Sequence, residues 1–326
     1  MNRFAELRNF FHSIYENKDF LYIIQPCSIG DVLYTGGLSY AVQKRKNKEA
    51  SVLVLLERMK NLGITYKNLA GIIYLPSYMS GATEQYFYQT GDYEGDNYIY
   101  GHFRNEGNGY VFDDNLNMID RCKKNIFNIP LDAEFIPPVV FPISEQNINE
   151  LNEKYILDKS RTIIILPHAH TLELAVPNFW EVLVQQLKAR GYIVYTNTDG
   201  IREKPVEGTE AISPNFRELF FISDKVKCFI GIRNGIFDFL AMTKARLMNI
   251  STFAQWWFCD LSIMYPNCNN RTFYDAVNYL RPIAAYFQKE KVKAQINLSH
   301  EKINPKDIFY SYKEMLTAML QDLEKM

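Results

Sequence analysis

The sequence has almost no net charge, no long apolar run and no sign of a secretion signal. Its 36 Lys and Arg residues nearly balance 37 Asp and Glu residues, so no overall field attracts nucleic acid or an anionic membrane. No apolar run reaches the roughly 18 residues of a membrane span, and the polar start MNRFAELRNF lacks the apolar stretch of a signal peptide. These absences favour a cytoplasmic protein with a small-molecule ligand and no nucleic-acid partner. Peripheral membrane association and the oligomeric state are left open.

The sequence also lacks paired cysteines and a glycine-rich dinucleotide fingerprint. Its five cysteines are odd in number and contain no CxxC pair, which is typical of reduced thiols that pack as small apolar side chains. No GxGxxG occurs at the first predicted turn: the turn contains only Gly30, and Gly36 and Gly37 lie inside the following helix. An NAD-dependent oxidoreductase, which would need such a turn, is therefore the weaker alternative.

The chain has the length and the strand–helix alternation of two α/β domains. At 326 residues it exceeds the size at which one core usually stops growing. In the first half, residues 20–26, 51–56 and 71–75 have the continuous apolar character of parallel strands covered on both faces. Helical spacing follows over 31–44. Residues 77–110 are rich in Gly, Asn and Tyr and are predicted to form long surface loops.

The second half repeats the alternation. The predicted strands and helices follow one another at 161–166, 177–190, 192–196, 213–225, 227–232 and 234–243. A terminal amphipathic helix is predicted over 305–325 and can pack on either half. Three prolines in 135–142 indicate a linker. The expected fold class is α/β, with doubly wound, Rossmann-like domains at 1–145 and 146–326 that face a central cleft.

The first predicted turn, between the strand at 20–26 and its helix, holds Ser28, Gly30 and Asp31. Ligands of open α/β sheets bind at the carboxyl ends of parallel strands, where such turns gather. A carboxylate there can take a proton from a substrate hydroxyl and so act as a general base. Asp31 is equally suited to cap the helix, because Asp accepts hydrogen bonds from free N–H groups at a helix start.

The equivalent turn of the second half contains Arg233, Asn234, Gly235 and Asp238. A permanent positive charge on Arg233 beside a helix start suits a diphosphate. Asp238, one turn later, can accept hydrogen bonds from ribose hydroxyls. For both residues the alternative is a charged side chain at a helix end with no ligand.

The third turn contains His168 and His170, which share one face of an extended segment. No third ligand at suitable spacing accompanies them, so hydrogen bonding of His168 to a phosphate or hydroxyl, or a purely structural role, is preferred to a metal site. The adjacent pair Asp113 and Asp114 falls in a polar stretch and is interpreted as a solvated turn. We expect no metal and no cofactor.

These motifs resemble those of the lipopolysaccharide heptosyltransferase family, glycosyltransferase family 9. Residues 28–35, SIGDVLYT, are similar to the family's S-x-G-D-x-L-x-T opening, whose aspartate is the catalytic base; the resemblance assigns that role to Asp31. Residues 163–168 occupy the place of its donor-binding I-x-P-G/H loop, and residues 229–241 resemble its I-G-x-D-S/T-G-x-x-H-L-A segment. The resemblance implies the GT-B fold, with an acceptor-binding first domain and a nucleotide-sugar-binding second domain.

The second-half motif departs from the family pattern. Arg233 and Asn234 stand where the family has Asp and Ser or Thr, Asp238 replaces a histidine, and Glu173 lies near the place of a phosphate-contacting lysine. With Asp31 as base and Arg233 on the diphosphate, we expect a metal-independent, inverting glycosyltransferase of bacterial surface polysaccharide synthesis, with a nucleotide sugar and a glycan acceptor as partners. The donor's base and sugar stay open. The departures also allow a non-catalytic nucleotide-sugar-binding partner of another transferase.

Overall fold

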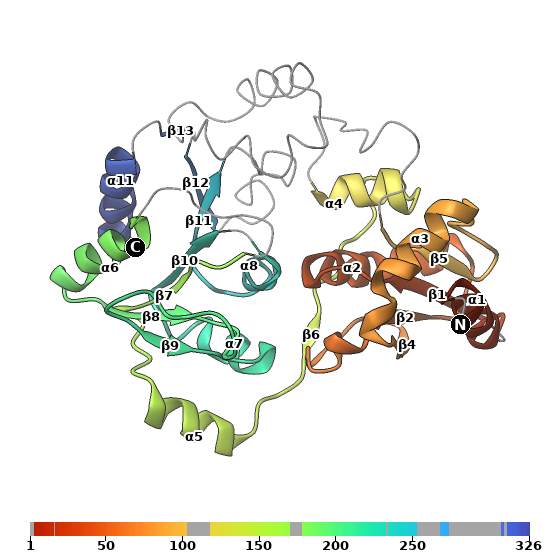
Figure 1. Ribbon diagram of the computed structural model, residues 1–326, viewed down its shortest axis with the longest axis horizontal. Helices are drawn as coiled ribbons and strands as arrows, with labels where there is room; N and C mark the ends of the chain where they lie inside the picture. The colour runs from red at the N-terminus through yellow and green to blue at the C-terminus, as the bar shows by residue number, and fades with distance from the viewer. Residues whose placement is uncertain are drawn as a thin grey trace. The chain divides into compact units, whose positions relative to one another are not determined.

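The computed structural model describes residues 3–15, 17–102, 118–169, 178–232, 234–252, 268–273, 308–309 and 312–326. The chain divides into two compact units, Met1–Phe141 and Pro142–Met326 (Figure 1). The division falls at the end of the proline-rich 135–142 stretch. In the described ranges, no helix combines the length and the apolar character that crossing a membrane requires.

The first unit is built on a four-stranded parallel sheet with the order β4-β2-β1-β5. Its strands are β1 (Phe20–Gln25), β2 (Ala50–Leu56), β4 (Leu69–Leu75) and β5 (Tyr98–Tyr100). Strands β1 and β2 are buried along almost their whole length, as their continuous apolar sequence predicts. The short strands β3 (Ile64–Thr65) and β6 (Val139–Val140) form a separate antiparallel pair.

Helices and single turns connect these strands. They are α1 (Arg3–Ile14), α2 (Ile29–Arg45), η1 (Glu57–Met59), η2 (Ser77–Met79), α3 (Ser80–Thr90), α4 (Met118–Arg121) and η3 (Cys122–Ile126). Two glycines inside α2 allow close packing, since a Cβ on Gly36 would meet the ring of Tyr66 and a Cβ on Gly37 the ring of Phe135. The predicted helix over 31–44 is thus confirmed.

The prediction of long surface loops over 77–110 is wrong for the described part of that stretch. Residues 80–90 form α3, which ends at Gly91 in the left-handed conformation (φ 67°), and residues 98–100 form β5. The aromatic side chains that made the stretch look irregular are packed: Phe87 is 1% exposed and stacks on Tyr100 at 4.4 Å between ring centroids. Tertiary packing of aromatic rings outweighed local composition.

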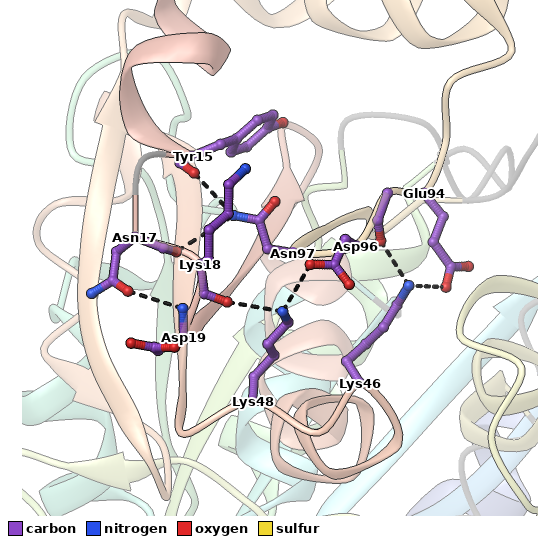
Figure 2. A network of polar contacts seen from close by, with 10 residues as sticks. Tyr15, Asn17, Lys18, Asp19, Lys46, Lys48, Glu94, Asp96 and Asn97 are labelled. Atoms are coloured by element: carbon purple, nitrogen blue, oxygen red, sulfur yellow. Dashed lines mark hydrogen bonds and ion pairs between the residues drawn. The ribbon is translucent and has the colours of Figure 1, made fainter.

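Ion pairs tie the carboxyl end of α2 to the segment that leads into β5. The ammonium of Lys48 donates to the carbonyl of Lys18 at 2.8 Å and pairs with Asp96 at 3.1 Å, while Lys46 pairs with Glu94 at 2.6 Å (Figure 2). Cations at this end of a helix also interact favourably with its dipole. The loops before β1 and β5 are thereby fixed to the same helix end.

The second unit contains a seven-stranded parallel sheet with the order β13-β12-β11-β10-β7-β8-β9. Its strands are β7 (Thr162–Leu166), β8 (Ile193–Asn197), β9 (Glu210–Ile212), β10 (Cys228–Ile232), β11 (Leu247–Thr252), β12 (Cys268–Phe273) and β13 (Ile308–Phe309). The three strands predicted in this half are β7, β8 and β10. Both β7 and β10 are buried at every residue.

The helices of the second unit agree with the predicted alternation, although each of the four predicted helices is shorter than expected. They are α5 (Glu145–Lys154), α6 (Phe179–Ala189), α7 (Phe216–Ile222), α8 (Gly235–Ala241) and α11 (Tyr312–Lys325). The chain leaves α6 through Gly191, whose φ of 82° suits glycine.

The terminal helix starts later than predicted and packs within its own unit. Residues 308–309 form the edge strand β13, and α11 begins at Tyr312. Figure 1 shows α11 beside α6, and Met315, Met319 and Leu323 of α11 are fully buried in the core cluster of the second unit. The described part of this helix therefore belongs to the core of the second unit.

Candidate active site

The turn between β1 and α2 holds the predicted catalytic aspartate. Ser28 is the N-cap of α2, with extended backbone angles (φ −83°, ψ 170°). Oδ2 of Asp31 accepts hydrogen bonds from the backbone N–H of Ser28 at 3.1 Å and from its hydroxyl at 2.6 Å. Ser28 is exposed, Asp31 is half-buried and Gly30 is buried in the first helical turn.

The N-cap residue of α2 is Ser28, and Asp31 takes part in the cap from within the first helical turn. Asp31 is the third residue of the helix, and its carboxylate returns to the N-cap, as the acid of a capping box does. Its position is thereby fixed at the carboxyl end of a parallel strand while the side chain keeps partial contact with solvent. A structural and a chemical role are compatible at this position.

Gln25, the last residue of β1, anchors the turn to the neighbouring helix and strand. Its side-chain amide donates to the hydroxyl of Thr35 at 2.9 Å and to the carbonyl of Gly101, and its Oε1 accepts from the backbone N–H of Cys27 at 3.2 Å. Gln25 is 1% exposed, so these bonds form away from water, where losing them is costly. The motifs in the sequence do not identify Gln25; its signal is a polar side chain that ends an apolar strand.

Side chains from two further segments hold the turn from outside. The hydroxyl of Ser80 donates to the carbonyl of Pro26 at 3.0 Å, and the guanidinium of Arg58 donates to the carbonyl of Cys27 at 3.1 Å. The thiol of Cys27 donates to Glu84 at 3.3 Å. Burial raises the pKa of Cys27 well above its usual value, and the carboxylates of Asp31 and Glu84 raise it further. The thiol therefore keeps its proton.

His102 completes the cluster around Asp31. It follows β5, whose end is joined to β1 by the bond from the N–H of Gly101 to the carbonyl of Ile24 at 2.8 Å. One potential ligand atom from each of Cys27, Asp31 and His102 lies within 4.8 Å of the other two, and all three residues are half-buried. Spacing along the sequence carries no signal for this cluster, because His102 reaches it only through the pairing of β5 with β1.

In the second unit, the structure brings His168 and Asn234 together. Asn234 caps α8: its Oδ1 accepts from the backbone N–H of Phe237 at 3.0 Å, and its Nδ2 donates to the carbonyl of His168 at 2.9 Å. Nε2 of His168 donates to the carbonyl of Lys204 at 3.0 Å. The turns after the neighbouring strands β7 and β10 are thus joined side chain to backbone.

The other predicted residues of this turn differ in their surroundings. Gly235 is half-buried at the start of α8. Asp238 is only 4% exposed, and this burial leaves its carboxylate little access to a ribose hydroxyl. The contact with ribose stays a prediction. Arg233 lies outside the described residues, as do His170 and the pair at 113–114.

Solved glycosyltransferases share this fold. The structure of a family 9 glycosyl transferase from Veillonella parvula aligns with a TM-score of 0.54 at 11% identity, over 86% of this chain and 97% of that one. ADP-heptose LPS heptosyltransferase II of E. coli aligns with a TM-score of 0.52 at 12% identity, over 86% and 99% of the two chains. Dodecameric iron-containing heptosyltransferase TibC, solved with ADP-D-beta-D-heptose, gives 0.50 at 12% identity, over 76% and 61%.

No protein-family model and no curated protein matches the sequence. At identities of 11 and 12% the structural likeness concerns the fold. The predicted α/β architecture with parallel sheets is therefore confirmed. So is the predicted likeness of the fold to the heptosyltransferases of glycosyltransferase family 9.

Proposed function

We propose that this protein is a glycosyltransferase that moves a sugar from a nucleotide-diphosphate donor to a glycan or glycoconjugate acceptor. The observation that carries the proposal is the half-buried carboxylate of Asp31, fixed at the carboxyl end of β1 by Ser28. It occurs on a fold shared with solved glycosyltransferases. The first unit would bind the acceptor at Asp31, and the second unit would bind the donor at Arg233.

In the proposed reaction, Asp31 takes the proton of the acceptor hydroxyl as that oxygen attacks the anomeric carbon of the donor sugar. The bond from this carbon to the diphosphate breaks on the opposite face, so the configuration at the carbon inverts. The nucleoside diphosphate leaves with the bonding electrons, and the proton stays on Asp31 until solvent removes it. The proposed reaction needs no metal ion, because the carboxylate of Asp31 activates the acceptor and Arg233 stabilises the leaving diphosphate.

On the donor side, the guanidinium of Arg233 neutralises the charge that develops on the leaving diphosphate. Asn234, the residue after Arg233 in the sequence, donates to the carbonyl of His168 and so joins the start of α8 to the turn after β7. His168 and Gly235 complete the proposed donor site. TibC, with a similar fold, was solved with ADP-D-beta-D-heptose, so ADP-sugars are the first donors to test. A role in bacterial surface polysaccharide synthesis in the cytoplasm follows from the same resemblance.

A thermal-shift screen against ADP-, GDP-, UDP- and CMP-sugars, followed by a transfer assay, tests this function. A donor at a hundred times its dissociation constant stabilises the protein by about 2.7 kcal/mol. Stabilisation by one nucleotide class together with sugar transfer supports the proposal. Tight binding without transfer indicates the non-catalytic binding partner instead. NAD belongs in the same screen, and stabilisation by NAD alone would favour the oxidoreductase.

The donor-side assignment is tested by Arg233→Ala. Because the guanidinium is proposed to bind the diphosphate, the variant is expected to bind the nucleoside diphosphate at least about tenfold more weakly by calorimetry, in line with the 1.5–3 kcal/mol of a hydrogen bond to a charged group. Arg217→Ala, on the exposed face of α7, is the matched control and should bind as the wild type does. Unchanged affinity in Arg233→Ala would reject the phosphate role.

A further inference from the structure

Three different metal-ligating groups lie close together, and one of them is the proposed base, Asp31. Cys27 comes from the turn before α2, Asp31 from the first turn of α2 and His102 from the end of β5. A sulfur, a carboxylate oxygen and a ring nitrogen lie within 4.8 Å of one another. Because all three residues are half-buried, the cluster is reachable from solvent yet held by the surrounding structure.

Among the described residues, the charges that act on the thiol of Cys27 are two carboxylates, Asp31 and Glu84, and one cation, Arg58. Glu84 lies 3.3 Å from the sulfur of Cys27, so two carboxylates face one thiol. Arg58 is exposed, and its guanidinium donates to the backbone carbonyl of Cys27. A bound cation would therefore bring the charge that these carboxylates favour.

The orientation of His102 is also defined. The hydroxyl of Tyr88, on α3, lies 3.5 Å from its Nδ1, and its ring packs edge to face on Tyr100 at 6.1 Å between centroids. Outer contacts of this kind orient the histidine ligands of metal sites. Tyr88 thus connects the cluster to the fold rather than leaving His102 at the end of a loop.

We propose that Cys27, Asp31 and His102 bind a zinc-type divalent cation, with water as the fourth ligand. Mixed sulfur, nitrogen and oxygen donors in tetrahedral arrangement are the ligands that Zn²⁺ prefers. Bond lengths of about 2.0–2.3 Å place such ligand atoms roughly 3.5 Å apart, so the three side chains close by about 1 Å around the ion. The thiolate is the ligand, and binding releases the thiol proton of Cys27 to solvent.

The consequence for activity rests on the proposed function. A cation bound to Asp31 occupies the carboxylate that would accept the acceptor's proton, so zinc inhibits the transfer and a chelator restores it. The site is thus regulatory, which agrees with a transfer reaction that uses no metal. Cys27 and His102 take no part in that reaction, so replacing them should relieve inhibition without abolishing transfer.

The site is tested directly by titrating Zn²⁺ into the full chain without a histidine tag and measuring the heat of binding by calorimetry. The wild type is expected to bind one Zn²⁺ at this cluster, and Cys27→Ser and His102→Ala should each weaken the binding more than about tenfold, at least as much as outer contacts of metal sites contribute. Co²⁺ should give a thiolate-to-metal absorption band that Cys27→Ser removes. His12→Ala, which changes an exposed histidine of α1, is the control and should bind like the wild type.

Equal zinc affinity in the wild type and in both variants would overturn the site, even if the enzyme transfers sugar. Zinc binding that depends on Cys27, in a protein that transfers no sugar even after a chelator has removed the metal, would instead support the site and reject the proposed function. If the wild type binds zinc through these residues and transfers sugar at the same rate with and without bound zinc, the regulatory role is wrong.

Discussion

Gln25 is buried below the turn that leads to Asp31 and is bonded to three parts of the first unit. Replacing it by Leu removes hydrogen bonds to Thr35, Gly101 and Cys27 and leaves their buried polar groups without this partner. Unsatisfied buried groups of this kind cost about 1–3 kcal/mol. We expect Gln25→Leu to lower the free energy of unfolding by that amount in urea denaturation. Gln185→Leu, on the exposed face of α6, should change it by less than about 0.5 kcal/mol; equal stability of the two variants would contradict the role of Gln25.

Gly231 allows β10 to approach β7 next to the second turn. A Cβ at this position would lie 2.7 Å from both the Cβ and the carbonyl oxygen of Leu166 and 2.7 Å from the ring of Phe237. Since a backbone atom cannot rotate away, Gly231→Ala should destabilise the protein by about 1–3 kcal/mol, measured by thermal or urea unfolding. Gly71→Ala in β4, where nothing lies within 4 Å, is the matched control. A Gly231→Ala variant as stable as this control would be evidence against the close approach.

At the level of residues, the sequence predicted the members of each turn and missed their neighbours. Ser28 and Asp31 were identified because they are adjacent in one motif. Gln25, Glu84 and His102 were not, because they meet the turn only through strand pairing and through α3. Contacts between distant parts of a chain leave no periodic signal in a single sequence.

At the scale of elements, the end of α2 provides a test of the electrostatic contacts. Glu94 pairs with Arg45 and Lys46, both at 2.6 Å. Burial raises the pKa of Glu94, but the hydrogen bonds and charges of Lys46 and Arg45 outweigh burial and hold the pKa below its usual value. A lowered pKa stabilises the folded protein above the unfolded value of about 4.3, and this stabilisation is lost as the pH falls through the folded value.

We therefore expect Glu94→Gln to lower the free energy of unfolding by up to about 1 kcal/mol at pH 7, the range of partly exposed ion pairs. The difference from the wild type should shrink as the pH falls below about 4, because the wild-type carboxylate is then protonated. Urea unfolding at pH 7 and pH 3 measures both. A difference that is the same at both pH values would show that the ion pairs contribute no stability. Glu207→Gln, at an exposed position of the second unit, is the control and should show no such dependence on pH.

The elements that could be predicted are those with continuous apolar character or clear helical spacing, such as β1, β7 and α2. The stretch containing α3 and β5 could not, because Gly81 and the tyrosines are typical of loops until their packing partners are known. The start of α11 was also predicted too early, since residues 308–309 join the edge of the sheet. Short edge strands depend on a neighbour that local sequence does not specify.

At the scale of the whole molecule, the fold is shared with glycosyltransferases at identities of 11 and 12%. Two units with parallel sheets followed from length and from repeated strand–helix alternation, which many sequences satisfy. A fold alone does not specify a substrate. The first turn matches a known pattern closely and the second departs from it, so sugar transfer is better supported than the identity of the donor.

The most direct test of this account compares turnover and donor binding in Asp31→Asn. Asparagine keeps the size of the side chain and an oxygen that can accept the hydrogen bonds from Ser28, but it cannot take a proton from the acceptor. With the donor identified by the screen, the account predicts a fall in turnover of at least about a hundredfold, with the dissociation constant of the nucleotide sugar unchanged. Wild-type turnover in Asp31→Asn would contradict it and leave Asp31 as a helix-capping residue only.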